Sequence, residues 1–156
     1  MNMALQIEKN GEAFYRAAAR RVPEGEVRDV LEDLAVQEQH HYKTFQKLAG
    51  QAGPPPALSG PEWEEYGEYV QTALENALFA GPDKALAAAE GIETAEEALR
   101  MALGFEKDTL LFFYDLREMV PERDREVVDR IIREEKAHAE NTENTESTES
   151  TEAVKR

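Results

Sequence analysis

The chain has 156 residues, of which 41% are hydrophobic and 33% are charged, and this suits a single globular domain with at most a short appendage. Its 33 acidic and 18 basic residues give a net charge of −15, which repels phosphate backbones and anionic membrane surfaces. We therefore expect neither nucleic acid nor a membrane as a partner. The absence of cysteine excludes disulfides, thiolate metal sites and cysteine nucleophiles. The N-terminus lacks a secretory signal pattern, and we expect a cytoplasmic protein.

Proline and glycine residues divide the chain into helical segments, and no segment of useful length alternates as a strand does. Breaks are expected at Val22-Pro23-Glu24-Gly25 and at Val120-Pro121-Glu122, and a capping box is expected at Thr94-Ala95-Glu96-Glu97. The expected helices, in chain order, span residues 2–22, 26–49, 62–80, 83–90, 95–119 and 123–140.

The last part of the chain has a different composition. Residues 141–152 read NTE-NTE-STE-STE, a polar tract of period three without apolar residues. Such a tract predicts a disordered, solvated tail, with a peptide recognised by a partner as the alternative. We therefore expect a helical domain over residues 1–140 and an acidic low-complexity tail over residues 141–156.

The four long helices contain an internal repeat. Glu8-Lys9-Asn10 recurs as Glu106-Lys107-Asp108 at an offset of 98, and the Val-Pro-Glu turn recurs at the same offset. Glu38 and His41 recur as Glu135 and His138 at an offset of 97. The chain therefore predicts an all-α four-helix bundle made of two duplicated helical hairpins. Residues 51–92 form the long crossover between them, and the expected order is up-down-down-up.

Each long helix has an apolar stripe at spacings of three and four, and each stripe contains a glutamate where a bundle core favours leucine. A lone carboxylate in an apolar core is costly, and four converging carboxylates also repel one another. Two bound divalent metals resolve both problems. The residues predicted to face one another are Glu8, Glu38, His41, Glu106, Glu135 and His138.

The pattern of these six residues is specific. One glutamate comes from each of two helices, and one Glu-x-x-His comes from each of the other two, which is the ligand set of ferritin-like di-iron and di-manganese bundles. Glu and His three apart share one helix face, so both reach one metal. We expect Glu38 and Glu135 to bridge two irons. Glu8 and His41 would complete one iron, and Glu106 and His138 the other.

On these residues the sequence resembles the rubrerythrin-like branch of the ferritin superfamily over residues 2–140. The resemblance implies a ferritin-like bundle with two iron ions, or manganese, and it matches Tyr15 to a tyrosine that supports a ligand. Full-length peroxidases of that family carry a cysteine-ligated rubredoxin domain, which this chain lacks, so an external electron donor is expected. That family also has an extra glutamate where this chain has Thr109, which makes the expected site more symmetric, nearer the bacterioferritin-like arrangement.

Three functions of different classes follow. The first is a non-haem di-iron peroxidase or ferroxidase that couples oxidation of Fe(II) to reduction of hydrogen peroxide or O₂. The alternative is an iron-binding protein for iron uptake, storage or delivery. The third is a structural dimer module, whose metals only stabilise the fold. A homodimer or higher homo-oligomer is expected in each case.

Simpler interpretations exist for several residues. If the buried faces of the helices are assigned wrongly, the four glutamates and two histidines would face solvent in a metal-free bundle. Other glutamates fall off the stripes and are expected on solvated faces, as is His40, while Phe112, Phe113 and Tyr114 are expected to serve packing. These off-stripe glutamates are Glu12, Glu32, Glu134 and Glu140. A stripe in the crossover is expected to pack on the bundle or on a partner, and it comprises Trp63, Tyr66, Val70, Ala73 and Ala77.

Overall fold

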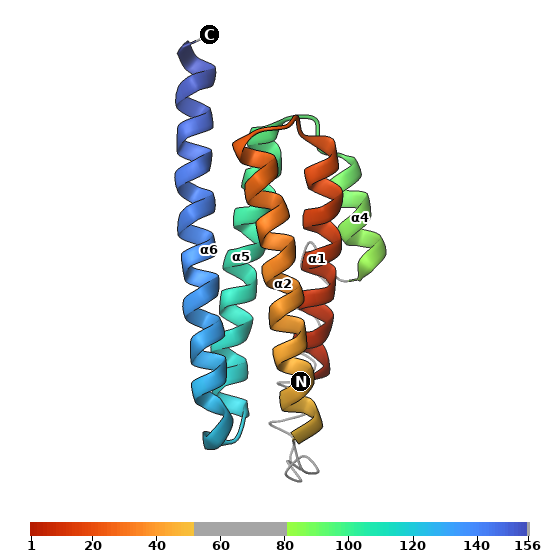
Figure 1. Ribbon diagram of the computed structural model, residues 1–156, viewed down its shortest axis with the longest axis vertical. Helices are drawn as coiled ribbons and strands as arrows, with labels where there is room; N and C mark the ends of the chain where they lie inside the picture. Colours follow the sequence, from red (N-terminus) through yellow and green to blue (C-terminus); the bar gives the residue numbers. More distant parts are fainter. Residues whose placement is uncertain (52–80, 156) are drawn as a thin grey trace, which may run out of the picture.

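The computed structural model describes residues 1–51 and 81–155 (Figure 1). Among these residues there is no strand, which confirms the all-α class. The helix expected over residues 62–80 and the stripe that begins at Trp63 lie outside the described residues. The described helices are α1 (Asn2–Arg21), α2 (Glu26–Gln51), α4 (Pro82–Glu90), α5 (Ala95–Met119) and α6 (Glu122–Lys155).

The four long helices form two antiparallel hairpins that lie side by side. Helix α1 packs along α2, and α5 packs along α6, while the two hairpins meet mainly through α2 and α6 and through α1 and α5. Figure 1 shows α1 and α6 running in one direction and α2 and α5 in the other, so the up-down-down-up order is confirmed. The short helix α4 packs against the outside of α1. None of the described helices combines the length and the apolarity that a membrane crossing requires.

The helix ends follow the local signals in the sequence. Between α1 and α2, Gly25 adopts a φ of 147°, a value that favours glycine. Thr94 caps the N-terminus of α5, and its side chain accepts a 3.1 Å hydrogen bond from the backbone N–H of Glu97. Glu97 in turn accepts from the backbone N–H of Glu93 at 3.0 Å. This reciprocal capping fixes where α5 begins, and therefore how far along the bundle its core-facing residues lie.

The bundle core consists of two apolar clusters with the glutamates between them. One cluster includes Phe14, Leu31 and Leu99, and the other includes Phe45 and Phe113. On α2 and α5 the buried glutamate, Glu38 or Glu106, follows the residues of the first cluster and precedes those of the second. The apolar layers on both sides therefore keep water from the acidic layer and fix its position in the bundle.

Helix α6 continues much farther than expected. Residues 141–152 are helical rather than disordered, and Figure 1 shows α6 extending beyond the ends of the other helices. Each NTE or STE triplet turns the threonine by about 60° around the helix. Thr142 and Thr145 therefore stay on the buried face, while Thr148 is exposed. The first triplets also pair with α5, through Glu143 with Lys107 and Glu146 with Arg100.

Candidate metal centre

The structure brings the six predicted ligand residues together from the four long helices. The side chains of the four glutamates are fully buried, His41 is 2% exposed and His138 is 14% exposed. The two imidazole rings face each other, with centroids 5.8 Å apart and planes inclined by 26°. The alternative in which these residues face solvent is therefore wrong for this fold.

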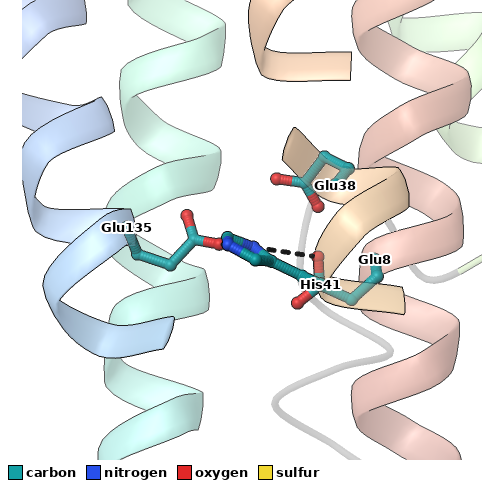
Figure 2. A group of neighbouring side chains, drawn as sticks. All are labelled: Glu8, Glu38, His41 and Glu135. Carbon is teal, nitrogen blue, oxygen red and sulfur yellow. Dashed lines mark ion pairs between the residues drawn. The ribbon is translucent and has the colours of Figure 1, made fainter. Parts of the chain in front are cut away.

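The ligand atoms form two groups that share one residue. In the first group, Glu8, Glu38, His41 and Glu135 each offer an atom within 4.8 Å of the others. In the second group, Glu135 meets Glu106 and His138 within the same limit. Figure 2 shows the His41 ring between the Glu135 carboxylate from α6 and the Glu8 carboxylate from α1. Glu135 thus occupies the shared position expected of a bridge, whereas Glu38 belongs to the first group alone.

Among the described residues, most of the ligand atoms of this cluster are buried and have no hydrogen-bond partner outside the cluster. They are both carboxylate oxygens of Glu8, Glu38 and Glu135, Oε2 of Glu106, and Nδ1 of His41 and His138. Buried polar atoms are almost always satisfied, so a set this large needs an explanation. Divalent metal ions supply it, because carboxylate oxygen and imidazole nitrogen together suit iron and manganese. The residues present therefore fit a pair of such ions.

The charge balance leads to the same conclusion. Burial, together with the charges of neighbouring glutamates, raises the pKa of Glu8, Glu38 and Glu106 well above the ordinary value. Burial acts to lower the pKa of His41, but contacts with Glu135, Glu38 and Glu134 outweigh it and raise the pKa to about 9. Without metal the cluster therefore keeps several protons, and cations of charge +2 would displace them.

One side chain of the cluster has the opposite shift. Burial acts to raise the pKa of Glu135, but contacts with His138, His41 and Glu106 outweigh it and lower the pKa. His41 Nδ1 lies 2.7 Å from Glu135 Oε1, and His138 Nδ1 lies 3.6 Å from Glu135 Oε2. Both imidazoles therefore direct Nδ1 toward the carboxylate that the two groups share.

Tyr15 supports the cluster from α1. Its hydroxyl donates a short hydrogen bond to Glu106 Oε1 on α5, so the residue links the two hairpins. Burial and the charges of Glu106 and Glu38 raise the pKa of Tyr15 well above its ordinary value, so the hydroxyl keeps its proton. The predicted contact between Tyr15 and a glutamate of the cluster is present, and it leaves Oε2 as the free oxygen of Glu106.

Glu134 has a role that the sequence interpretation missed. Its side chain is 45% exposed, yet its Oε2 lies 2.9 Å from His41 Nε2. A carboxylate oxygen accepts hydrogen bonds, so this contact places a proton on Nε2 and leaves Nδ1 to face the cluster. The expectation of a purely solvated Glu134 is therefore wrong. The signal in the sequence was its position directly before the Glu135-x-x-His138 motif.

Gly11 is a second residue whose role the sequence interpretation missed. A Cβ atom at this position would lie 2.6 Å from Glu38 Oε2 and 2.7 Å from Phe105 Cε1. Both distances are shorter than side chains tolerate, so only glycine leaves room for the Glu38 carboxylate. His40, Glu32 and Glu140 are exposed and Phe113 is buried, as expected, while Glu12 is half-buried and pairs with Arg16. The expectation that Tyr114 serves packing is wrong, because its side chain is exposed.

Comparison with known proteins gives one match. The family described as Rubrerythrin matches residues 1–146 of the chain. No curated protein and no solved structure matches the chain. The matched range includes all six residues of the cluster as well as Tyr15 and Glu134.

Proposed function

Because the chain belongs to the rubrerythrin family, we propose that it holds two iron ions in this cluster and couples Fe(II) oxidation to the reduction of hydrogen peroxide or O₂. The family binds a di-iron centre, and the structure has a buried Glu/His cluster that fits one. The observation that supports the proposal best is the set of buried ligand atoms that have no hydrogen-bond partner outside the cluster. They lie in one layer, between two apolar clusters, with two imidazoles directed at a shared carboxylate.

Two positions for iron follow from the two groups of ligand atoms. Glu8, Glu38 and His41 would hold one ion, Glu106 and His138 the other, and Glu135 would contact both. When bound, the pair would supply one electron from each ion, which matches the two electrons and two protons that convert hydrogen peroxide to two waters.

The chain's own residues set the environment of this reaction. The apolar layers above and below the cluster exclude water, and a low dielectric strengthens every interaction between carboxylate and cation. Tyr15 keeps Glu106 oriented through its hydrogen bond, and the proton of that bond stays on the Tyr15 hydroxyl. Glu134 orients His41 through Nε2. No residue of this chain provides a second iron site of cysteine thiolates, so we propose that electrons come from a separate donor.

A second candidate function is iron uptake, storage or delivery. The observation that favours it is the net charge of −15, which draws cations toward the protein. In that case O₂ would be the oxidant, and Fe(III) would leave the cluster after each turnover.

The reaction with each oxidant separates the two candidates. Metal-free protein is loaded with Fe(II) without oxygen and is mixed with hydrogen peroxide or with O₂ in a stopped-flow spectrometer. We expect faster oxidation by peroxide, with two Fe(II) consumed per peroxide, and no comparable phase in Glu135→Ala. The exposed His40→Ala variant serves as the control and should behave as wild type. Faster oxidation by O₂ would favour the iron-handling function, and oxidation by neither would contradict the proposal.

A further inference from the structure

The two halves of the repeat are not identical around the cluster. Three of the differences between matching positions of the two hairpins concern residues beside the ligands. Gly11 matches Thr109, Tyr15 matches Phe113, and Gln37 matches Glu134, at the same offsets that relate the ligand residues. Each difference changes the hydrogen bonds or the space around one of the two groups of ligand atoms.

The largest difference concerns the two histidines. His41 has the Glu134 carboxylate 2.9 Å from its Nε2, across the interface between α2 and α6. At the position of the first hairpin that matches Glu134, the chain has Gln37, whose side chain is a neutral amide. A carboxylate behind a ligating imidazole fixes the tautomer and the ring orientation and increases the basicity of the ligand nitrogen. A neutral amide lacks the negative charge that increases the basicity of an imidazole, so Gln37 cannot support His138 as Glu134 supports His41.

The glutamates differ in the same direction. In the first group no described residue outside the cluster donates a hydrogen bond to Glu8 or Glu38, and Gly11 leaves the space that Glu38 needs. In the second group the Tyr15 hydroxyl already occupies one oxygen of Glu106. The first group also has four residues, all buried, whereas the second has three, of which His138 is partly exposed.

We infer that the two metal positions are inequivalent and that the position formed by Glu8, Glu38, His41 and Glu135 binds a divalent metal first, with Glu134 as the positioning residue that makes it the tighter one. The inference rests on the proposed function, because it takes the cluster to be a metal centre. It adds an order of filling and a residue outside the ligand set that determines the order.

Stepwise titration with Co(II) tests the inference without any measurement of activity. Metal-free wild-type protein is titrated in the absence of oxygen, and binding is followed by calorimetry and by the visible absorption of Co(II). We expect two steps, of which the first is tighter. In Glu134→Gln the first step should weaken by about 10- to 100-fold, while the second changes little. Glu140→Gln removes an exposed charge from the same helix and should match wild type.

Two further variants identify which position each step belongs to. His138→Ala should abolish the second step and keep the first, and Glu134→Gln added to it should weaken the single remaining step. Gln37→Glu provides a reciprocal test, because it places a carboxylate at the position that matches Glu134. It should tighten the second step and bring the two affinities closer.

The outcomes are separable. Two equal steps in wild type, or a Glu134→Gln isotherm that equals that of Glu140→Gln, would overturn the inference and leave the proposed function standing. Failure of wild-type protein to bind any Co(II), Mn(II) or Fe(II) would overturn both. Retention of the first step in His138→Ala, together with its selective weakening in Glu134→Gln, supports the inference.

Discussion

Replacement of Gly11 by alanine perturbs the cluster by one methyl group. The new Cβ would lie 2.6 Å from Glu38 Oε2, so the carboxylate would have to withdraw by about 0.8 Å or more to reach ordinary contact. Phe105 blocks the other side at 2.7 Å. Metal sites need their ligands within about 0.5 Å of the productive geometry, so this displacement is large enough to spoil the first position.

The cost in stability can be bracketed. An additional methyl group in a packed core costs about 1–3 kcal/mol, while alanine gains up to ~1 kcal/mol over glycine inside a helix. Gly104 gives a matched control, because it is also inside a helix, but no atom of the other described residues lies within 4 Å of a Cβ placed there. Gly104→Ala should gain only the stability that the higher helix propensity of alanine provides. The difference between the two variants is therefore expected to be about 1–3 kcal/mol.

Denaturant unfolding of both metal-free variants measures this difference, and a Co(II) titration measures the ligand effect. We expect Gly11→Ala to be less stable than Gly104→Ala and to lose about 10-fold or more in affinity at the tighter step. Equal stability of the two alanine variants, together with wild-type affinity in Gly11→Ala, would show that the space at Gly11 does not position Glu38.

Three further predictions concern the same layer. Tyr15→Phe removes the hydrogen bond to Glu106, and denaturant unfolding should show a loss of about 1 kcal/mol with weaker binding at the second metal position. Glu135→Ala should lower the metal content at both positions, whereas Glu8→Ala should lower it mainly at one, as measured by elemental analysis; equal losses would argue against a shared Glu135. The metal-free protein should become less stable as pH rises from about 5 to about 9, because His41, with a pKa near 9, and the carboxyls of raised pKa bind protons more tightly when folded. Thermal melts across this range should show a falling Tm that bound metal removes, and a rising Tm in the metal-free protein would contradict the assignment.

The helices and the seam could be predicted from sequence because both depend on local signals. Proline, glycine and the Thr94 cap define where helices end, and spacings of three and four define which face is buried. Helix α2 shows this most clearly, because the residues of its stripe at spacings of three and four are all buried. They are Val27, Leu31, Leu34, Glu38, His41, Phe45 and Leu48. The repeat then fixed the pairing of helices, because two copies of one hairpin must place their matching faces together.

Contacts between helices were harder to predict. Glu134 lies about 100° around α6 from Glu135, and only the closeness of α2 brings it to His41. The requirement for glycine at position 11 likewise depends on where Glu38 and Phe105 lie in space. The helical continuation past residue 140 was missed because the composition suggests disorder, whereas Thr142 and Thr145 are buried in the described structure. The spacing of apolar residues along one helix does not predict contacts with residues of another helix.

The metal content of the protein tests the central claim most directly. Purified metal-free protein is loaded with Fe(II) under anaerobic conditions, freed of excess metal, and measured by elemental analysis beside Glu135→Ala and His40→Ala. The account predicts two iron ions per chain in wild type and in His40→Ala, with a clear loss at both positions in Glu135→Ala. An iron content in wild type that is no higher than in Glu135→Ala would contradict it.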